Sequence, residues 1–393
     1  MLLSIALILL LGLLFGSLFS KAKLPSLLGM ILVGIVMSPY ALDLIDESIL
    51  NISADIRQMA LVIILTRAGL SLDIADLKKV GRPAILMCFV PACMEIIGTV
   101  LLAPLLLGVS VLEAAIIGSV IAAVSPAVIV PRMIRLMEEG YGTGKSIPQL
   151  ILAGASVDDV FVIVVFTAFT SLAATGTVSA ASFLQIPVSI ILGILAGMAV
   201  GMLLVKFFQA FHMRDSVKLL IIISISFLLI ELQNRIGNIV PFSGLLAIMG
   251  LGIVMKKKYD ILAKRLSVKY NKLWVAAEVF LFVLVGATVD LKYAVTAGGY
   301  AVLLVLGALV FRMLGVALSL IGTDLNRKER FFCALAYLPK ATVQAAIGAI
   351  PLTMGLPCGQ LVLTVAVLSI LITAPLGAIC VDNLYQKLLY RDL

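Results

Sequence analysis

Two adjacent carboxylates lie in the middle of a long apolar segment. Asp158 and Asp159 follow the residues GASV and precede VFVIVV. On a helix, neighbouring residues point about 100° apart, so one side chain can line a cavity while the other faces a partner helix. A carboxylate held away from water can exchange a proton for a hard cation, which prefers oxygen ligands. We expect Ser156, Thr342 and backbone carbonyls freed near Ser125 to complete an oxygen shell around such a cation.

Glu95, Arg312 and Lys340 are further ionisable residues inside apolar segments. If these segments cross a bilayer, a charge near its centre costs about 2.5–3.5 kcal/mol, so each of the three is a functional candidate. Glu95 and Arg312 have opposite charges, and we predict that they form a buried ion pair. Arginine rarely loses its proton, whereas a desolvated lysine can, so Lys340 is the basic group that could take part in proton coupling. Arg67 is expected only to anchor its helix.

The composition indicates that lipid surrounds most of the protein. Of the 393 residues, 62% are apolar and 13% are charged, whereas ordinary soluble domains are about 45–50% apolar and about 25% charged. This argues against a soluble enzyme, a disordered chain and a secreted disulfide scaffold. The five cysteines are scattered and the chain has one histidine, which argues against a zinc or haem site. We therefore predict an all-α polytopic membrane protein that needs no cofactor.

Thirteen segments approach the length of about 20 apolar residues that crosses the hydrocarbon layer. We predict spanning helices over 2–20, 24–41, 54–72, 83–108, 110–135, 147–173, 184–206, 217–234, 240–255, 273–290, 297–321, 330–351 and 359–381. The first is expected to be a retained helix rather than a signal peptide, because no charged segment precedes it and no small-residue cleavage site follows. The connections are short, so residues 1–393 are expected to form a single membrane unit.

Basic residues alternate along the predicted connections. Most of the 29 lysines and arginines fall on every second connection, and such residues accumulate on the cytoplasmic side. This predicts an N-terminus outside and a C-terminus inside, and it explains the net charge of +8 without nucleic acid. The basic run 256–272 is interpreted as a cytoplasmic loop, with an interfacial helix on anionic lipid as the alternative.

Two of the predicted helices are expected to be broken. The fifth contains Ser125 and Pro126, and the twelfth contains Pro339 and Lys340. Proline removes a backbone donor and frees a carbonyl, which lipid tolerates only where the backbone is buried in protein or lines a wet cavity. The two helices would run antiparallel and lie seven apart in order. We therefore predict two inverted repeats, helices 1–6 and helices 8–13, with two broken crossing helices. No residue-by-residue repeat is visible, so this prediction rests on topology.

Four segments, AVSPAVIVPRM, GASVDD, LPKATVQAAIG and LTVAVLSILITAPLGAI, carry a resemblance that covers nearly the whole chain. They closely resemble the double-aspartate branch of the cation/proton antiporter superfamily, in particular subfamily B of the mammalian sodium/hydrogen exchangers and its bacterial relatives. The resemblance implies a homodimer. It also implies a scaffold of helices 1–3 and 7–10 (about 1–75 and 180–292) and a moving core of helices 4–6 and 11–13 (about 80–175 and 295–383).

The resemblance further implies roles for individual residues. Asp159 matches the principal ion-binding carboxylate and Asp158 its partner, Ser125 and Pro126 match the first crossover, Pro339 and Lys340 lie at the second, and Glu95 and Arg312 match the core ion pair. Arg312 stands where many bacterial double-aspartate relatives have lysine, which leaves the exchange stoichiometry open.

These observations predict a secondary active antiporter that exchanges Na⁺, and Li⁺, for H⁺ by alternating access and serves pH homeostasis. Proton and cation would compete for Asp159 and Asp158. The expected location is the bacterial inner or plasma membrane, and the expected partners are membrane lipid and small inorganic cations. The alternative is a Na⁺-coupled organic-solute symporter of the same architecture. A passive cation channel is a third reading, and a membrane enzyme is disfavoured because no His, Ser or Cys constellation accompanies the acids.

Overall fold

The computed structural model describes residues 1–71, 81–175, 180–236 and 242–391. Throughout these ranges the regular elements are helices, accompanied by one isolated β-bridge between Tyr141 and Arg391. The helices are α1 (Leu2–Lys21), α2 (Ser26–Met37), α3 (Glu47–Asn51), α4 (Ser53–Ser71), α6 (Arg82–Met87), α7 (Val90–Leu107), α8 (Val111–Ile121), α9 (Pro126–Glu139), α10 (Ile147–Thr175), α11 (Ala180–Ala210), α12 (Asp215–Ile236), α13 (Gly244–Lys258), α14 (Asp260–Ala287), α15 (Leu291–Ser319), α16 (Arg327–Ala336), α17 (Thr342–Ile347), α18 (Ile350–Thr353) and α19 (Gly359–Leu388). The all-helical prediction is therefore confirmed.

Eight helical segments among the described residues are long and apolar enough to cross a membrane. They are Leu2–Lys21, Arg82–Leu107, Val111–Glu139, Ile147–Ala174, Ile191–Ala210, Asp260–Ala287, Gly298–Ser319 and Gly359–Leu388. Two shorter apolar helical segments, Ser26–Met37 and Thr342–Thr353, accompany them. The protein is thus polytopic, while the count of thirteen spans, the inverted repeats and the orientation of the termini remain predictions.

The basic run 256–272 is helical except at Tyr259, so the prediction of an irregular loop is wrong, while its cytoplasmic side remains a prediction. Helix α13 continues to Lys258, and α14 begins at Asp260 and runs unbroken to Ala287. The physical reason is an apolar stripe at helical spacing: Leu262, Leu266 and Tyr270 are all buried on one face of α14, and such a stripe stabilises a helix despite the charges between its members.

The described chain forms two compact units. Unit 1 comprises Met1–Ala54, Ile74–Thr170 and Val279–Leu393, and unit 2 comprises Asp55–Asp73 and Ser171–Glu278. This division differs from the predicted scaffold and core, and that functional division remains a prediction.

Unit 2 is held together by close approach of α11 and α13. Gly193, Gly197 and Gly201 recur every fourth residue and therefore share one face of α11. A Cβ atom at Gly197 would lie 2.7 Å from the Cα atom of Ala247 on α13. Small residues at this spacing let helix backbones approach closely in a membrane protein.

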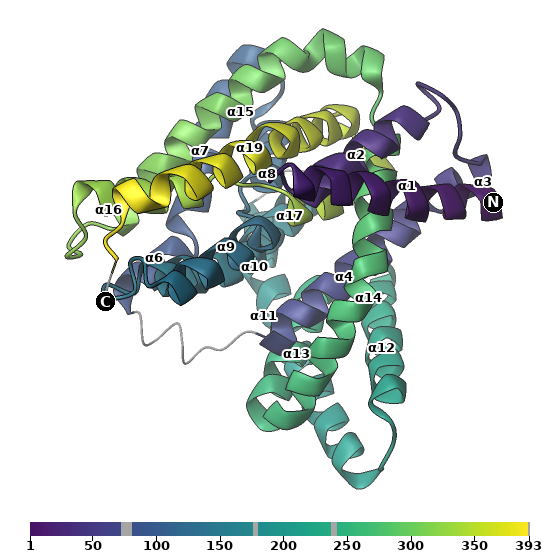
Figure 1. Ribbon diagram of the computed structural model, residues 1–393. Coiled ribbons are helices and arrows are strands. Elements are labelled where there is room, and N and C mark those ends of the chain that lie inside the picture. Colours follow the sequence, from purple (N-terminus) through teal and green to yellow (C-terminus); the bar gives the residue numbers. More distant parts are fainter. Residues whose placement is uncertain (72–80, 176–179, 237–241, 392–393) are drawn as a thin grey trace. The chain divides into compact units, whose positions relative to one another are not determined.

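Unit 1 contains the two interrupted helices. In it α7 packs along α15, α8 packs against α7 and α19, and α16 packs against α19 (Figure 1). A buried cluster at one end includes Met133 of α9, Ile151 of α10, Phe332 of α16 and Val381 of α19. These contacts fix the ends of both interrupted helices against their neighbours.

Candidate functional site

Both predicted breaks are present, and they touch each other. The first separates α8 from α9, which begins at Pro126, and the second separates α16 from α17 and contains Pro339. Proline suits the first turn of a helix, where its missing N–H group costs nothing, and it cannot continue a helix that precedes it. The backbone N–H of Ser125 donates to the carbonyl of Pro339 at 2.8 Å. The two breaks are therefore joined directly through the backbone.

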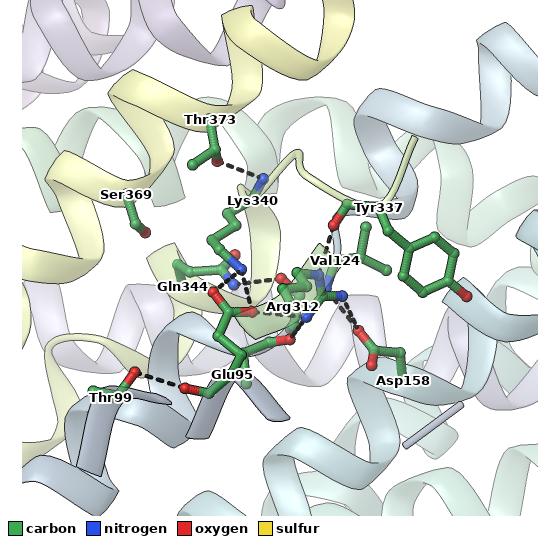
Figure 2. A network of polar contacts seen from close by, with 12 residues as sticks. Glu95, Thr99, Val124, Asp158, Arg312, Tyr337, Lys340, Gln344, Ser369 and Thr373 are labelled. Carbon is green, nitrogen blue, oxygen red and sulfur yellow. Dashed lines mark hydrogen bonds and ion pairs between the residues drawn. The ribbon is translucent and has the colours of Figure 1, made fainter. Parts of the chain in front are cut away.

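Arg312 of α15 lies fully buried between the two breaks (Figure 2). Its Nε atom donates to the carbonyl of Tyr337 at 2.6 Å, and its Nη1 atom donates to the carbonyl of Ala122. These carbonyls follow the last residues of α16 and α8, where the helix dipole is negative. One guanidinium, with its five fixed donors, thus satisfies the ends of both interrupted helices.

The same guanidinium contacts two buried carboxylates. Its Nη1 atom lies 2.8 Å from Oε2 of Glu95, and its Nη2 atom lies 3.1 Å from Oδ2 of Asp158. The ammonium of Lys340 lies 2.7 Å from Oε1 and 2.8 Å from Oε2 of Glu95. All four side chains are 0% exposed. Two acids and two bases therefore form a network with no net charge.

Asp158 uses one of its two oxygens in this network. Its Oδ2 atom accepts from Arg312 and, at 2.7 Å, from the backbone N–H of Val124. Its Oδ1 atom is buried and lacks a hydrogen-bond partner among the described residues. Asp158 is thus fixed at one oxygen and unsatisfied at the other.

Asp159 is half-buried, and its Oδ1 atom is buried with no described partner. The hydroxyls of Ser125 and Thr342 are likewise buried and have no hydrogen-bond partner among the described residues. Ser125 directly follows Val124, which binds Asp158, and Thr342 begins α17 at the second break. The side chain of Ser156 lies outside the described residues. Four buried oxygens, one each on Asp158, Asp159, Ser125 and Thr342, therefore lack a described hydrogen-bond partner and are candidate ligands for a cation or a proton.

Three residues of the site were missed by the sequence reasoning. Thr373 of α19 accepts from the backbone N–H of Lys340 at 2.9 Å, Tyr337 offers its carbonyl to Arg312, and Gln344 donates to the carbonyl of Ala123 at 2.8 Å. The sequence signal for Gln344 was its amide side chain among apolar residues in ATVQAAIG. The others act through backbone groups or a common threonine, which carry no such signal.

These contacts restrict which backbone carbonyls near Ser125 could bind a cation. The carbonyl of Ala122 accepts from Arg312 and that of Ala123 accepts from Gln344. Both already have a donor, so a cation would have to displace it. The side-chain oxygens are the better candidates for the ligands.

Arg67 and Glu278 belong to unit 2, where they interact electrostatically with each other. This agrees with an anchoring role for Arg67. Among the described residues no group of three or more His, Cys, Asp or Glu side chains could hold a resident metal ion. The expectation that the protein needs no cofactor remains a prediction.

Comparison with known proteins covers almost the whole chain. The profile of a family described as "Sodium/hydrogen exchanger, transmembrane" matches residues 5–385. Sodium/hydrogen exchanger 9B2 of Mus musculus is 32% identical over 399 residues, which cover 96% of this chain and 72% of that protein. Its Homo sapiens counterpart is 33% identical over 385 residues, covering 94% and 70%. Sodium/hydrogen exchanger 9B1 of Homo sapiens is 31% identical over 382 residues, covering 94% and 73%.

A solved structure has the same fold. The sodium proton antiporter MjNhaP1 from Methanocaldococcus jannaschii at pH 8 superposes with a TM-score of 0.84, covering 98% of this chain and 97% of that one. The two sequences are 22% identical, so this similarity establishes the architecture alone.

Proposed function

Because the chain belongs to the sodium/hydrogen exchanger family, we propose that it exchanges Na⁺ for H⁺ across the membrane at a site centred on Asp159. Family membership makes it a multi-pass membrane transporter rather than an enzyme. The printed names of its relatives describe sodium/hydrogen exchange, which supports the choice of substrates.

The observation that carries the proposal is the charge balance around the two breaks. Glu95 and Asp158 are paired with Arg312 and Lys340 within 3.1 Å, whereas Asp159 forms no ion pair of its own among the described residues. Its buried Oδ1 atom has no described donor either. An ionised carboxylate removed from water needs a proton or a cation. Asp159 is therefore the group that alternates between the two.

Asp158 would serve as the fixed second carboxylate of the site. Two donors hold its Oδ2 atom, while its Oδ1 atom and the hydroxyls of Ser125 and Thr342 are unsatisfied. Oxygen ligands of this kind suit a hard cation. Ser156, one helical turn before Asp159, would add a further ligand. The same shell would accept Li⁺.

Transport requires the site to reach each side of the membrane in turn. We place the moving part in helices 4–6 and 11–13 of the predicted numbering, which contain the network and both breaks. Helices 1–3 and 7–10 would form the static scaffold and the homodimer contact. Because the breaks are joined by the hydrogen bond from Ser125 to Pro339, the core would move as one body by alternating access. A bacterial plasma membrane is the proposed location, and pH homeostasis is the proposed role.

The decisive experiment uses purified protein in liposomes with an internal pH dye and an imposed proton gradient. Adding Na⁺ or Li⁺ should collapse the gradient, whereas choline should not. Asp159→Asn should abolish the response. Asp43→Asn is the matched control, because Asp43 is exposed and has a backbone φ of 50° that asparagine tolerates.

A Na⁺-dependent response retained in full by Asp159→Asn would overturn the site assignment. Na⁺-stimulated uptake of an organic solute without proton movement would instead favour the symporter alternative. A current far above transporter turnover would favour a channel.

A further inference from the structure

The side-chain amide of Gln344 forms one hydrogen bond to each of the two breaks (Figure 2). Gln344 is 1% exposed. Its Nε2 atom donates to the carbonyl of Ala123 at 2.8 Å, and its Oε1 atom accepts from the backbone N–H of Ala341 at 2.8 Å. One partner is an obligate acceptor and the other an obligate donor, so the orientation of the amide is fixed by chemistry.

Capping of α17 accounts for only half of this arrangement. A glutamine at the third position of a helix commonly accepts from the N-cap backbone, and the bond from Ala341 does this. The bond to Ala123 serves no purpose in α17, because Ala123 lies in the segment after α8. The second bond therefore links two segments that are 221 residues apart.

The peptide group that Gln344 holds is the one that binds Asp158. The carbonyl of Ala123 and the N–H of Val124 belong to a single planar unit. Its oxygen accepts from Gln344, while its N–H donates to Oδ2 of Asp158 at 2.7 Å. Rotation of this unit would move both atoms together. A donor on the carbonyl also polarises the unit and strengthens its N–H as a donor.

The other end of Gln344 holds the second break next to Lys340. The N–H of Ala341 belongs to the peptide that follows Lys340, and the ammonium of Lys340 lies on Glu95. The amide of Gln344 thus ties the Lys340 side of the network to the Asp158 side through neutral hydrogen bonds.

We propose that Gln344 is a positioning residue: it orients the Ala123–Val124 peptide, which in turn orients Asp158 beside Asp159 and so sets the affinity for the transported cation. This inference rests on the proposed function. Without Gln344, the carbonyl of Ala123 loses its donor and the peptide can rotate away from Asp158. The apparent affinity for Na⁺ should then weaken while the maximal rate is largely kept.

The test measures the apparent KM and maximal rate for Na⁺ in liposomes for the wild type, Gln344→Leu and Gln344→Glu. For Gln344→Leu we expect KM to rise about tenfold at every pH, because a hydrogen bond to an ionised group is weakened, with the maximal rate within about twofold. Ser369→Ala is the control, because Ser369 is equally buried and donates to the Ala366 carbonyl of its own helix.

Gln344→Glu adds a measurement, the pH dependence of KM, that would not change if Gln344 had a purely structural role. A protonated carboxyl at this position keeps both hydrogen bonds. An ionised one loses its donor and faces Asp158, Glu95, Arg312 and Lys340. The ratio of its KM to that of the wild type should therefore fall towards one at acidic pH and rise at alkaline pH. This variant also keeps the inference testable if Gln344→Leu fails to fold.

The inference is overturned if folded Gln344→Leu keeps the wild-type KM, or if the Gln344→Glu ratio exceeds one and stays constant with pH. If the wild-type protein still moves protons in response to Na⁺, either of these results leaves the proposed function intact. A wild-type protein that moves no protons in response to Na⁺ overturns the proposed function and this inference with it.

Discussion

The backbone N–H of Ser125 donates to the carbonyl of Pro339 at 2.8 Å. This bond joins the two interrupted helices at their breaks, where the backbone groups have no hydrogen-bond partner within their own helix. Proline cannot donate, but its carbonyl remains a good acceptor. The breaks are therefore complementary at the level of the main chain. Side-chain hydrogen bonds from Arg312, Gln344 and Thr373 to backbone groups of the two breaks surround this bond.

Arg312 should be the most sensitive residue of the network for stability. Arg312→Ala would remove the donors of two helix-end carbonyls and leave Glu95 and Asp158 without their shared counter-ion. Breaking such a buried pair costs about 3–5 kcal/mol. We expect a large fall in the thermal unfolding temperature in detergent.

Arg312→Lys is the informative companion variant. Lysine keeps the charge but has no planar fork with which to reach four acceptors. Its unfolding temperature should lie between those of the wild type and Arg312→Ala. If Arg312→Ala unfolds at the wild-type temperature, the network has no stabilising role.

Glu95 and Lys340 should be energetically coupled. Either single change, Glu95→Gln or Lys340→Gln, leaves one uncompensated charge in a network that is neutral in the wild type. The double variant restores neutrality. We expect a coupling free energy of about 1 to 3 kcal/mol in a double-mutant cycle of unfolding free energies. Additive effects would show that the two charges do not interact.

Gly377 should tolerate no side chain, because α19 packs there directly on the second break. A Cβ atom at this position would lie 2.5 Å from Cδ and 3.1 Å from N of Pro339. The rigid ring cannot move aside, so Gly377→Ala should displace the break and cost about 1–3 kcal/mol. It should also lower the rate of Na⁺-dependent proton movement.

Gly299→Ala provides the matched control for Gly377→Ala. Within 4 Å of a Cβ atom at Gly299 there is no heavy atom of the described chain. Its transport rate and unfolding temperature should match those of the wild type. Equal behaviour of the two alanine variants would contradict the proposed contact with Pro339.

Exchange should be electrically silent. Four buried charges are matched within the network, and among the described carboxylates of the site this leaves Asp159 to exchange one proton for one monovalent cation. Arg312 keeps its proton and so cannot release a second one. A Na⁺ step on a solid-supported membrane should give no sustained transport current in the wild type. A steady Na⁺-evoked current that Asp159→Asn abolishes would show that a further proton is moved.

Much of the site could be predicted because ionisable residues and interrupted helices cost free energy in a membrane and therefore stand out in the sequence. Ionised residues in apolar segments drew attention to Asp158, Glu95 and Arg312, and prolines drew attention to the two breaks. The partners of Arg312 among the carbonyls, and the link from Gln344 to Ala123, could not be predicted. They depend on how two distant segments cross, and backbone groups look the same in every sequence.

The boundary of α14 shows a different kind of error. The charges of 256–272 predict a loop, yet Leu262, Leu266 and Tyr270 recur every fourth residue, which is the spacing of an apolar stripe on a helix. Lysine, arginine, leucine and alanine are all good helix formers. Polarity decides which side of a membrane a segment occupies, whereas periodicity decides whether the segment is a helix.

The most direct test of the central claim is the apparent KM for Na⁺ of the wild-type protein as a function of pH. If a proton and Na⁺ compete for Asp159, then in the acidic range, where the proton dominates, KM should fall about tenfold for each unit by which the pH rises. The maximal rate extrapolated to saturating Na⁺ should change far less. A KM that is independent of pH while activity falls with acidity would mean that the two ions bind separately, and would contradict the account.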